Sequence, residues 1–141
     1  MKTINEFPNI QSCNPRSCIS MKMMKCNRIV SNVFRKYLKP FGITNSQLST
    51  LFVITKANNP TQKLLSQMLY MDKSSVNRNL KRLIDNGYVA KLNIHDLQTT
   101  IKGKELLEQV IPHWEKAMKD IREELEDEGE LALNMVLQKL T

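Results

Sequence analysis

Four side chains that can recognise nucleic-acid bases lie close together in residues 74–78, namely Ser74, Ser75, Asn77 and Arg78. Arginine can donate two hydrogen bonds to guanine in the major groove, and serine and asparagine can reach other base edges. Basic residues suited to phosphate contacts accompany them: Lys73, Lys81, Arg82, Lys63 and Lys91. The chemistry that this combination supports is recognition of double-stranded DNA.

A helix is expected to present these side chains. Asp72 is a suitable N-cap, because its carboxylate can accept hydrogen bonds from the free backbone N–H groups of the first turn. Val76, Leu80 and Leu83 then recur at spacings of four and three and form one apolar stripe. The serine, asparagine, arginine and lysine side chains would therefore remain outside, on a polar face that suits the major groove.

The residues before Asp72 predict a second short helix. Its apolar positions are Leu64, Leu65, Met68 and Leu69. Only two residues separate it from the Asp72 cap, which is the spacing of a helix-turn-helix. The alternative is an ordinary amphipathic helix pair whose polar face is simply solvated.

A hairpin is expected directly after the helix that begins at Asp72, which we call the reading helix. Gly87 follows Asn86 where a left-handed residue would end the helix. Residues 88–92 are rich in strand formers, residues 97–101 would form the returning strand, and His95 would lie near the tip. The resulting expectation is a mainly α fold: a winged helix-turn-helix with a small two-stranded wing.

Long helices are expected on both sides of this unit. Residues 1–13 show no periodicity and are interpreted as a mobile arm or an edge contact. Asn14 and Pro15 would start a first helix that ends near Lys39. Its apolar stripe is Ile19, Met23, Cys26, Val30, Val33 and Tyr37. Thr44 and Gln47 form a capping box that opens a second helix, whose inner face would hold Leu48, Leu51, Phe52 and Thr55.

The last long helix would begin after Thr100 as N-cap and bend at Pro112. A final segment over residues 128–140 places Leu133, Val136, Leu137 and Leu140 on one side. The terminal helices carry more apolar surface than a chain of this size can bury internally. Their expected use is contact with a second copy of the chain.

The 141 residues suffice for a single domain, with residues 44–101 as the winged helix-turn-helix and residues 14–43 and 102–141 as dimerisation helices. Residues 1–104 carry 17 lysines and arginines against four acidic residues, a net charge of +13, whereas residues 105–141 carry four against ten, a net charge of −6. The positive charge therefore accompanies the reading helix and favours approach to phosphate. A membrane-surface or general solubility role for this charge is the alternative. We expect a cytoplasmic protein without a membrane span.

The sequence offers little for an enzyme, a metal or a cofactor. Four scattered glycines cannot form a phosphate-binding loop, and no paired carboxylates or nucleophile triad stand at a useful spacing. Cys13, Cys18 and Cys26 are three thiols without C-x-x-C spacing, and His95 and His113 are isolated histidines. We therefore expect reduced cysteines, no metal site and a protein that is not an enzyme.

The order of these elements resembles the MarR family of bacterial transcriptional regulators over nearly the whole chain. The likeness rests on residues 42–44 with Leu48, on residues 72–78 with Leu83, on residues 86–89, and on residues 99–103 with Leu106 and Leu107. It implies a homodimer on a pseudo-palindromic operator, with wings along the minor grooves. Family wings usually carry an acidic residue and arginines near the tip, whereas this one is short, with Lys91 as its basic residue and His95 as a candidate tip contact.

The resemblance also implies two candidate regulatory sites. Some members sense oxidants through a cysteine near the start of the first helix, where Cys18 lies with Cys13 and Cys26 nearby; the alternative is that Cys26 is a small core residue and the other two have no role. Family members often bind small aromatic acids, and the aromatic residues that could line such a cleft, or simply belong to the core, are Tyr37, Phe41, Phe52 and Trp114.

The function expected on these grounds is sequence-specific transcription regulation by a homodimeric repressor that a small ligand or an oxidant releases from DNA. The rival interpretation is a winged-helix protein-interaction module whose basic face binds an acidic protein partner. The two differ in whether the basic face meets duplex phosphates or acidic side chains.

Overall fold

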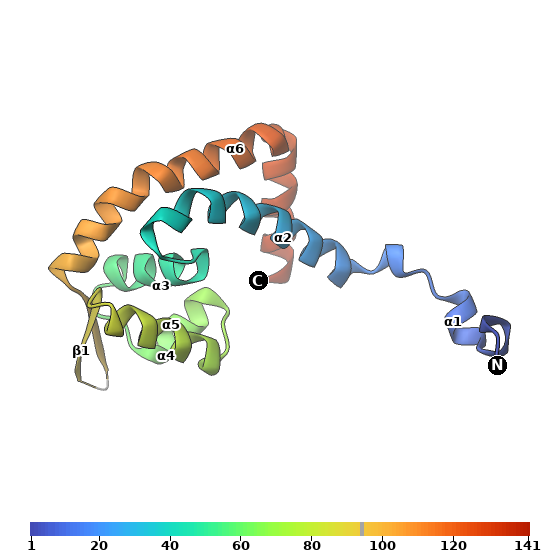
Figure 1. The fold of residues 1–141 in the computed structure, drawn as a ribbon, viewed down its shortest axis with the longest axis horizontal. Coiled ribbons are helices and arrows are strands. Elements are labelled where there is room, and N and C mark those ends of the chain that lie inside the picture. The colour runs from blue at the N-terminus through green and yellow to red at the C-terminus, as the bar shows by residue number, and fades with distance from the viewer. Residues whose placement is uncertain (94) are drawn as a thin grey trace. The chain divides into compact units, whose positions relative to one another are not determined.

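The computed structural model describes residues 1–93 and 95–141, and Figure 1 traces them as a set of helices with one small hairpin. Two units are distinguished, Met1–Asn32 and Val33–Thr141. The expected class, a mainly helical winged helix-turn-helix with a two-stranded wing, is confirmed. The expectation of one domain over residues 1–141 stays a prediction.

The first unit contains three short helical segments, η1 (Ile4–Glu6), α1 (Pro8–Ser12) and η2 (Pro15–Ser17), before the long helix α2 (Ile19–Leu38) begins. Two of these segments, η1 and α1, lie within residues 1–13, where the sequence shows no periodicity, and the role of this stretch as a mobile arm or an edge contact stays a prediction. Asn14 does cap a helix, since its Oδ1 accepts from Arg16 N at 3.2 Å, but that helix is the short η2. The long helix starts later than expected because Cys18 has extended backbone angles (φ −63°, ψ 117°).

In the second unit, α2 ends at Leu38 and the 3-10 turn η3 (Lys39–Phe41) leads to Gly42, which has φ 65°. Helix α3 (Asn45–Lys56) then begins with the expected capping box: Gln47 N donates to Thr44 Oγ1 at 3.1 Å, and Thr44 N donates to Gln47 Oε1 at 3.2 Å.

The inner face of α3 differs from the expected one. Leu48 and Leu51 are buried as expected, together with Thr50 and Ile54, whereas Phe52 and Thr55 are only half-buried. Thr50 is accommodated because its hydroxyl donates to Ser46 O at 2.9 Å, so that the buried polar group has a partner.

Helices α4 (Gln62–Leu69) and α5 (Lys73–Asp85) form the expected helix-turn-helix, and Tyr70 in the turn has a left-handed backbone with φ 51°. The four apolar side chains expected on α4 differ in burial. Leu65 is fully buried, but Leu64 is 38% exposed and Met68 is 51% exposed. A helix of two turns contacts α3 and α5 along one narrow strip, and Leu65 occupies it.

The core of the second unit lies among these helices, the wing and the start of the last helix. Its buried side chains are Phe34, Leu38, Ile43, Leu48, Leu51, Ile54, Leu65, Val76, Leu80, Leu83, Val89, Leu97, Leu106, Leu107, Val110 and Ala117. The apolar stripe expected on α5 is thus confirmed in full, and burial of that stripe leaves the polar side of α5 outside.

The wing is an antiparallel pair of strands, β1 (Val89–Asn93) and β2 (Asp96–Thr99), with Val89 opposite Thr99 and Lys91 opposite Leu97. Strand β1 contacts α5 and strand β2 contacts α3. Gly87 ends α5 as expected, with φ 78° and its N–H donating to Ile84 O at 2.9 Å.

Helix α6 (Ile101–Leu140) begins with Thr100 as N-cap, whose Oγ1 accepts from Gly103 N at 3.1 Å. Its non-helical backbone lies at Glu126, with φ 56° and ψ −179°, just before the final segment expected over residues 128–140, and the bend expected at Pro112 stays a prediction. Arg122 Nε and Glu130 Oε1 approach to 3.2 Å across this break. Residues eight positions apart in a straight helix are about 12 Å apart, so this pair depends on the change of direction at Glu126.

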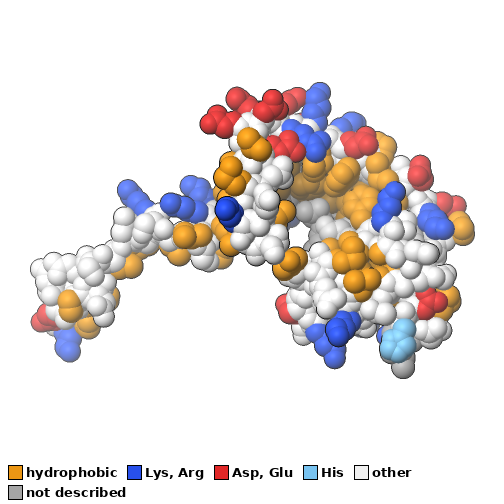
Figure 2. Space-filling view, turned by 180° about the vertical axis from the view of Figure 1, so that it is seen from behind, with side chains coloured by type: hydrophobic (Ala, Val, Ile, Leu, Met, Phe, Trp, Pro, Cys, Tyr) orange, Lys and Arg blue, Asp and Glu red, His pale blue; other side chains and the backbone are white. Residues whose placement is uncertain are grey.

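The segment of α6 after Glu126 leaves its apolar side chains exposed: Leu131, Leu133, Met135, Val136, Leu137 and Leu140. In the first unit the same holds for Ile19, Met21, Met23, Met24 and Ile29. Figure 2 shows acidic side chains concentrated along α6. None of the helices in the part of the chain that the structure describes has the length and hydrophobicity needed to cross a bilayer.

Candidate nucleic-acid interface

Helix α5 presents a polar and basic face because its apolar stripe is fixed in the core. Asp72 begins the helix as predicted, since its Oδ1 accepts from Ser75 N at 2.8 Å. The exposed side chains on α5 include every predicted DNA contact of this helix except Ser75, which is half-buried; they are Lys73, Ser74, Asn77, Arg78, Lys81 and Arg82. The structure therefore places these groups together on one accessible face.

Asn79, on the opposite side of α5 from this face, joins α5 to α3 and was not identified from the sequence. Its Nδ2 lies 2.8 Å from Ser46 Oγ, 3.2 Å from Thr50 Oγ1 and 3.3 Å from Ser46 O. These contacts oppose rotation of α5 about its axis, so they help to decide which side chains point outward. The sequence did indicate that Asn79 faces the core, because position 79 lies three residues after Val76 and four before Leu83, on the buried side of the helix.

A hollow separates α5 from the wing. Its volume is about 290 Å³ and it is lined by Gln62, Asn77, Leu80, Lys81, Ile84, Asp85 and Lys91. Gln62 Nε2, at the start of α4, donates a hydrogen bond to Asn77 Oδ1. This bond restrains the side chain of Asn77, which is one of the predicted base contacts. Lys81 and Lys91 give the hollow two positive charges.

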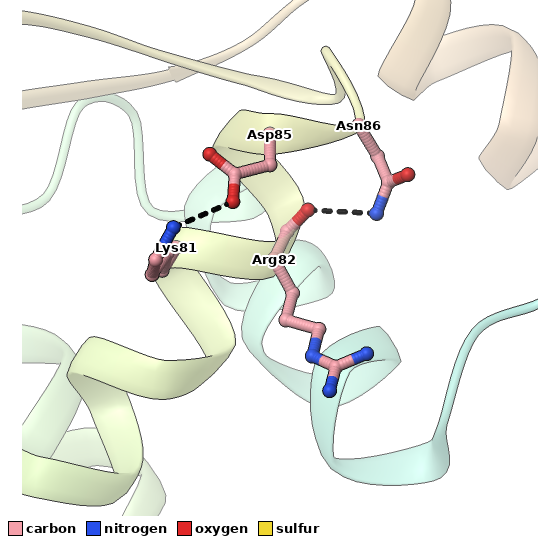
Figure 3. A network of polar contacts seen from close by, with 4 residues as sticks. All are labelled: Lys81, Arg82, Asp85 and Asn86. Atoms are coloured by element: carbon pink, nitrogen blue, oxygen red, sulfur yellow. Dashed lines mark hydrogen bonds and ion pairs between the residues drawn. The ribbon is translucent and has the colours of Figure 1, made fainter.

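Lys81 and Arg82 differ in how freely they can reach a ligand, as Figure 3 shows. Lys81 Nζ lies 2.9 Å from Asp85 Oδ2, in an exposed pair of a kind that contributes little to stability and is easily exchanged for another anion. The Arg82 guanidinium points away from that pair and has no partner among the described residues, while its carbonyl accepts from Asn86 Nδ2 at 2.8 Å.

The remaining predicted contacts lie on two other elements. Lys63 is exposed on α4, Lys91 is exposed on β1, and His95 is exposed beside the wing tip with its N–H donating to Asn93 Oδ1 at 2.8 Å. Residue 94, within the predicted tip over residues 93–96, lies outside the described residues. Positively charged groups thus flank α5 on both α4 and the wing.

The base of the wing is tied to the start of α6 by contacts that the sequence did not reveal. Thr100 Oγ1 donates to Gly87 O at 2.6 Å, Thr100 N donates to Tyr88 O at 3.0 Å, and Lys102 Nζ donates to Asn86 O at 2.8 Å. Gly103 is buried against Tyr88, where a side chain would collide with its carbonyl oxygen. The wing is therefore held in place relative to the end of α5.

The carboxyl group of Asp72 interacts with Ser75 and Arg78, two of the residues predicted to contact bases. A hydrogen bond from Ser75 N, a second from Ser75 Oγ and the positive charge of Arg78 hold the pKa of Asp72 below its ordinary value. Each of these interactions favours the charged carboxylate. Ionised Asp72 therefore contributes to the stability of the folded state.

We expect the stability of the protein to fall in acid partly through Asp72. Because its folded pKa is depressed, the contribution is complete above the unfolded pKa of about 4 and is lost as the pH falls through the folded pKa. Asp72→Asn keeps a capping oxygen but cannot titrate in this range. The urea midpoint of the variant should then be lower at pH 7, because it lacks the charged carboxylate, and the difference from the original protein should shrink between pH 5 and pH 2. Parallel losses would contradict this assignment.

The three cysteines lie in the first unit as free thiols. Cys13 and Cys26 are exposed and Cys18 is half-buried. The alternative in which Cys26 is a small core residue was wrong, because its side chain is exposed. Oxidant sensing by Cys18 stays a prediction.

The four aromatic residues of the predicted ligand cleft are half-buried in the second unit. Phe41 packs edge-on against His113 with ring centroids 4.9 Å apart, and Phe52 packs edge-on against Trp114 at 5.5 Å. Tyr37 donates a hydrogen bond to Asp120 Oδ2, which raises the pKa of Tyr37 above its ordinary value. These rings are thus engaged with α6 side chains, and their role as a ligand cleft stays a prediction.

Among residues 1–93 and 95–141, no three histidine, cysteine or acidic side chains lie close enough together to hold a metal ion.

Comparison with known proteins gives matches over the region just described. The model of the MarR family matches residues 41–96, which include α3, α4, α5 and most of the wing. The HTH-type transcriptional regulator BilQ of Clostridioides difficile (strain CD3) is 32% identical over 98 residues, which are 65% of this chain and 66% of that protein. The uncharacterized HTH-type transcriptional regulator YwoH of Bacillus subtilis (strain 168) is 26% identical over 121 residues, 79% of this chain and 88% of that one.

Solved structures share the fold at low identity. BpsR of Bordetella bronchiseptica, whose DNA binding is regulated by 6-hydroxynicotinic acid, matches with a TM-score of 0.79 and 14% identity. The match covers 92% of this chain and 98% of that one. The agreement therefore extends beyond the helix-turn-helix to the flanking helices.

Proposed function

The chain belongs to the MarR family of winged helix-turn-helix transcriptional regulators, and from this premise we propose that it binds a specific DNA operator as a homodimer. The observation that carries the proposal is the face of α5, where Ser74, Asn77 and Arg78 stand exposed among lysine and arginine side chains. A helix that buries Val76, Leu80 and Leu83 and exposes these groups fits the major groove.

The exposed residues divide into two roles. Ser74, Asn77 and Arg78 would contact base edges, because they lie near the N-terminal half of α5, which enters the groove in helix-turn-helix proteins. The phosphate contacts would come from Lys73, Lys81, Arg82, Lys63, Lys91 and His95. Phosphate contacts provide affinity for any duplex, and base contacts provide the preference among sequences.

The second copy would pack on the exposed apolar side chains of the terminal helices. Leu133, Val136, Leu137 and Leu140 lie on one side of the last segment of α6, and Ile19 and Met23 lie on the expected stripe of α2. Twofold symmetry would place two α5 helices at half-sites about 34 Å apart, on a pseudo-palindromic operator. A small aromatic ligand bound near Tyr37 and Trp114, or an oxidant acting at Cys18, would release a repressor from that operator.

The alternative is an interaction module in which the basic face binds an acidic protein. The family supports the DNA-binding regulator instead, and a salt titration distinguishes the two. The experiment measures the binding of the full chain to random duplex DNA, and to fragments selected from genomic DNA, between 50 and 200 mM salt. A regulator should bind the selected fragments more tightly at every salt concentration.

We expect the logarithm of the binding constant to fall linearly with the logarithm of salt concentration. Removing one phosphate contact should reduce that slope by about 0.9 per protomer. Lys73→Ala should therefore flatten the slope for random and selected DNA alike, whereas Lys139→Ala, at the far end of α6, should leave it unchanged. Binding that is weak, independent of salt or indifferent to sequence would favour the interaction module.

A further inference from the structure

Ser75 lies in the middle of a chain of hydrogen bonds on α5. Its backbone N–H donates to Asp72 Oδ1 at 2.8 Å, and its hydroxyl donates to Asp72 Oδ2 at 2.9 Å. The same hydroxyl oxygen accepts from Arg78 Nη2 at 3.1 Å. Asp72 therefore orients the hydroxyl of Ser75, and the hydroxyl in turn holds the guanidinium of Arg78.

This arrangement leaves Ser75 with little to offer a base. A hydroxyl has a single hydrogen to donate, and here that hydrogen is directed to the carboxylate of Asp72. One of its two lone pairs is occupied by Arg78. The side chain is also half-buried, whereas Ser74 beside it is exposed and has no side-chain partner among the described residues. The two adjacent serines are therefore not equivalent.

Arg78 keeps the donors that base recognition needs. A guanidinium has five N–H groups, and the contact with Ser75 uses one of them. A free arginine side chain loses considerable rotamer freedom when it docks, and a side chain already held in place loses less. Restraint by Ser75 would therefore favour one orientation of the guanidinium fork over the others that a flexible arginine could adopt.

We propose that Ser75, held by Asp72, is a positioning residue that fixes the orientation of Arg78 for guanine recognition and does not read a base itself. This inference rests on the proposed DNA-binding function and revises the base-contact role predicted for Ser75. It assigns the choice of base at this position to a unit of three side chains, Asp72, Ser75 and Arg78.

A double-mutant cycle tests the inference. The discrimination ratio is measured as the affinity of the full chain for a selected fragment divided by its affinity for fragments changed at single base pairs. Arg78→Ala should lower discrimination about tenfold or more at one base pair per half-site. Ser75→Ala should lower it about threefold or more at that same base pair. In the Arg78→Ala background, Ser75→Ala should have no further effect, because residues acting through one group are not additive.

Two further variants serve as controls. Ser75→Thr restores the hydroxyl and should recover the discrimination of the original protein. Ser74→Ala should combine additively with Arg78→Ala, because Ser74 has no contact with Arg78. Binding to random duplex should be almost unchanged in Ser75→Ala, and its urea midpoint reports whether the remaining Ser75 N–H to Asp72 bond keeps the helix intact.

Failure of the positioning role and failure of the proposed DNA-binding function give different results. Additive effects of Ser75→Ala and Arg78→Ala, or a loss of discrimination at a different base pair, would overturn the positioning role while leaving the regulator assignment in place. Failure of Ser75→Thr to recover discrimination, with normal folding, would also overturn it. If the original protein shows no preference among DNA sequences, the proposed function fails first.

Discussion

Replacing Gly103 with alanine is expected to destabilise the protein by about 3 kcal/mol, one of the two largest effects that we predict. An added Cβ would lie 2.3 Å from Tyr88 O, 2.8 Å from Thr99 Cγ2 and 3.1 Å from Tyr88 C. Two of these atoms are backbone, so a change of side-chain rotamer cannot relieve the collision. The wing or the start of α6 must move, which breaks the bonds that Thr100 makes there.

Urea denaturation measures this effect directly. With a slope typical of a small protein, a loss of about 3 kcal/mol lowers the midpoint by about 1 to 2 M. Gly129→Ala is the matched control in the same helix, because the three atoms nearest to its added Cβ all belong to the side chain of Leu125, at 3.0 to 3.6 Å. Its effect should stay within about 1 kcal/mol, since alanine favours the helix by about that amount. Equal midpoints for the two variants would show that the close approach at Gly103 is absent.

If the chain dimerises as proposed, replacing Leu137 with aspartate should convert that dimer to monomers and lower the affinity for the proposed operator on the order of 100-fold or more. Leu137 is exposed in a single chain, on the same side as Leu133, Val136 and Leu140. In a twofold interface the substitution is present in both protomers. Each protomer then loses a leucine that the interface would bury and gains a charge without a partner. Each monomer would then bind one half-site alone and lose the advantage of linked binding.

Sedimentation at micromolar concentration and fluorescence anisotropy on a selected fragment measure the two consequences. Gln138→Asp adds the same charge one position further along, off the apolar side, and should leave the dimer and its affinity unchanged. Binding of Leu137→Asp to random duplex should persist, because the face of α5 is untouched. A Leu137→Asp protein that remains dimeric and binds the fragment normally would show that this segment of α6 is not the interface.

Helix caps were predictable because each depends on one side chain and on a backbone N–H group only three residues further along the chain. Thr44, Asp72 and Thr100 each accept from a backbone N–H in the first turn that follows, as their types indicated. Asn14 shows the limit of this reasoning. It caps as predicted, but the helix it caps ends after one turn, because the backbone at Cys18 is extended.

The candidate site was predictable at the level of a face and not at the level of single contacts. The periodicity of Val76, Leu80 and Leu83 was enough to place Arg78 outside. It could not show that Ser75 is engaged on both sides, because that depends on the rotamers of two neighbouring side chains. Nor could it show that Asn79 reaches Ser46, which is 33 positions away in the chain.

Local sequence patterns therefore established most of the elements, several of their ends and the polar face of α5, since each depends on residue types within one or two turns, and the order of these elements along the chain indicated the family. Packing between distant segments decided the rest. Gly103 is required by the approach of Tyr88, and Leu65 alone is buried on α4 because only one strip meets its neighbours. Such features arise from surfaces that meet only in the folded chain, and spacing along one segment does not record them.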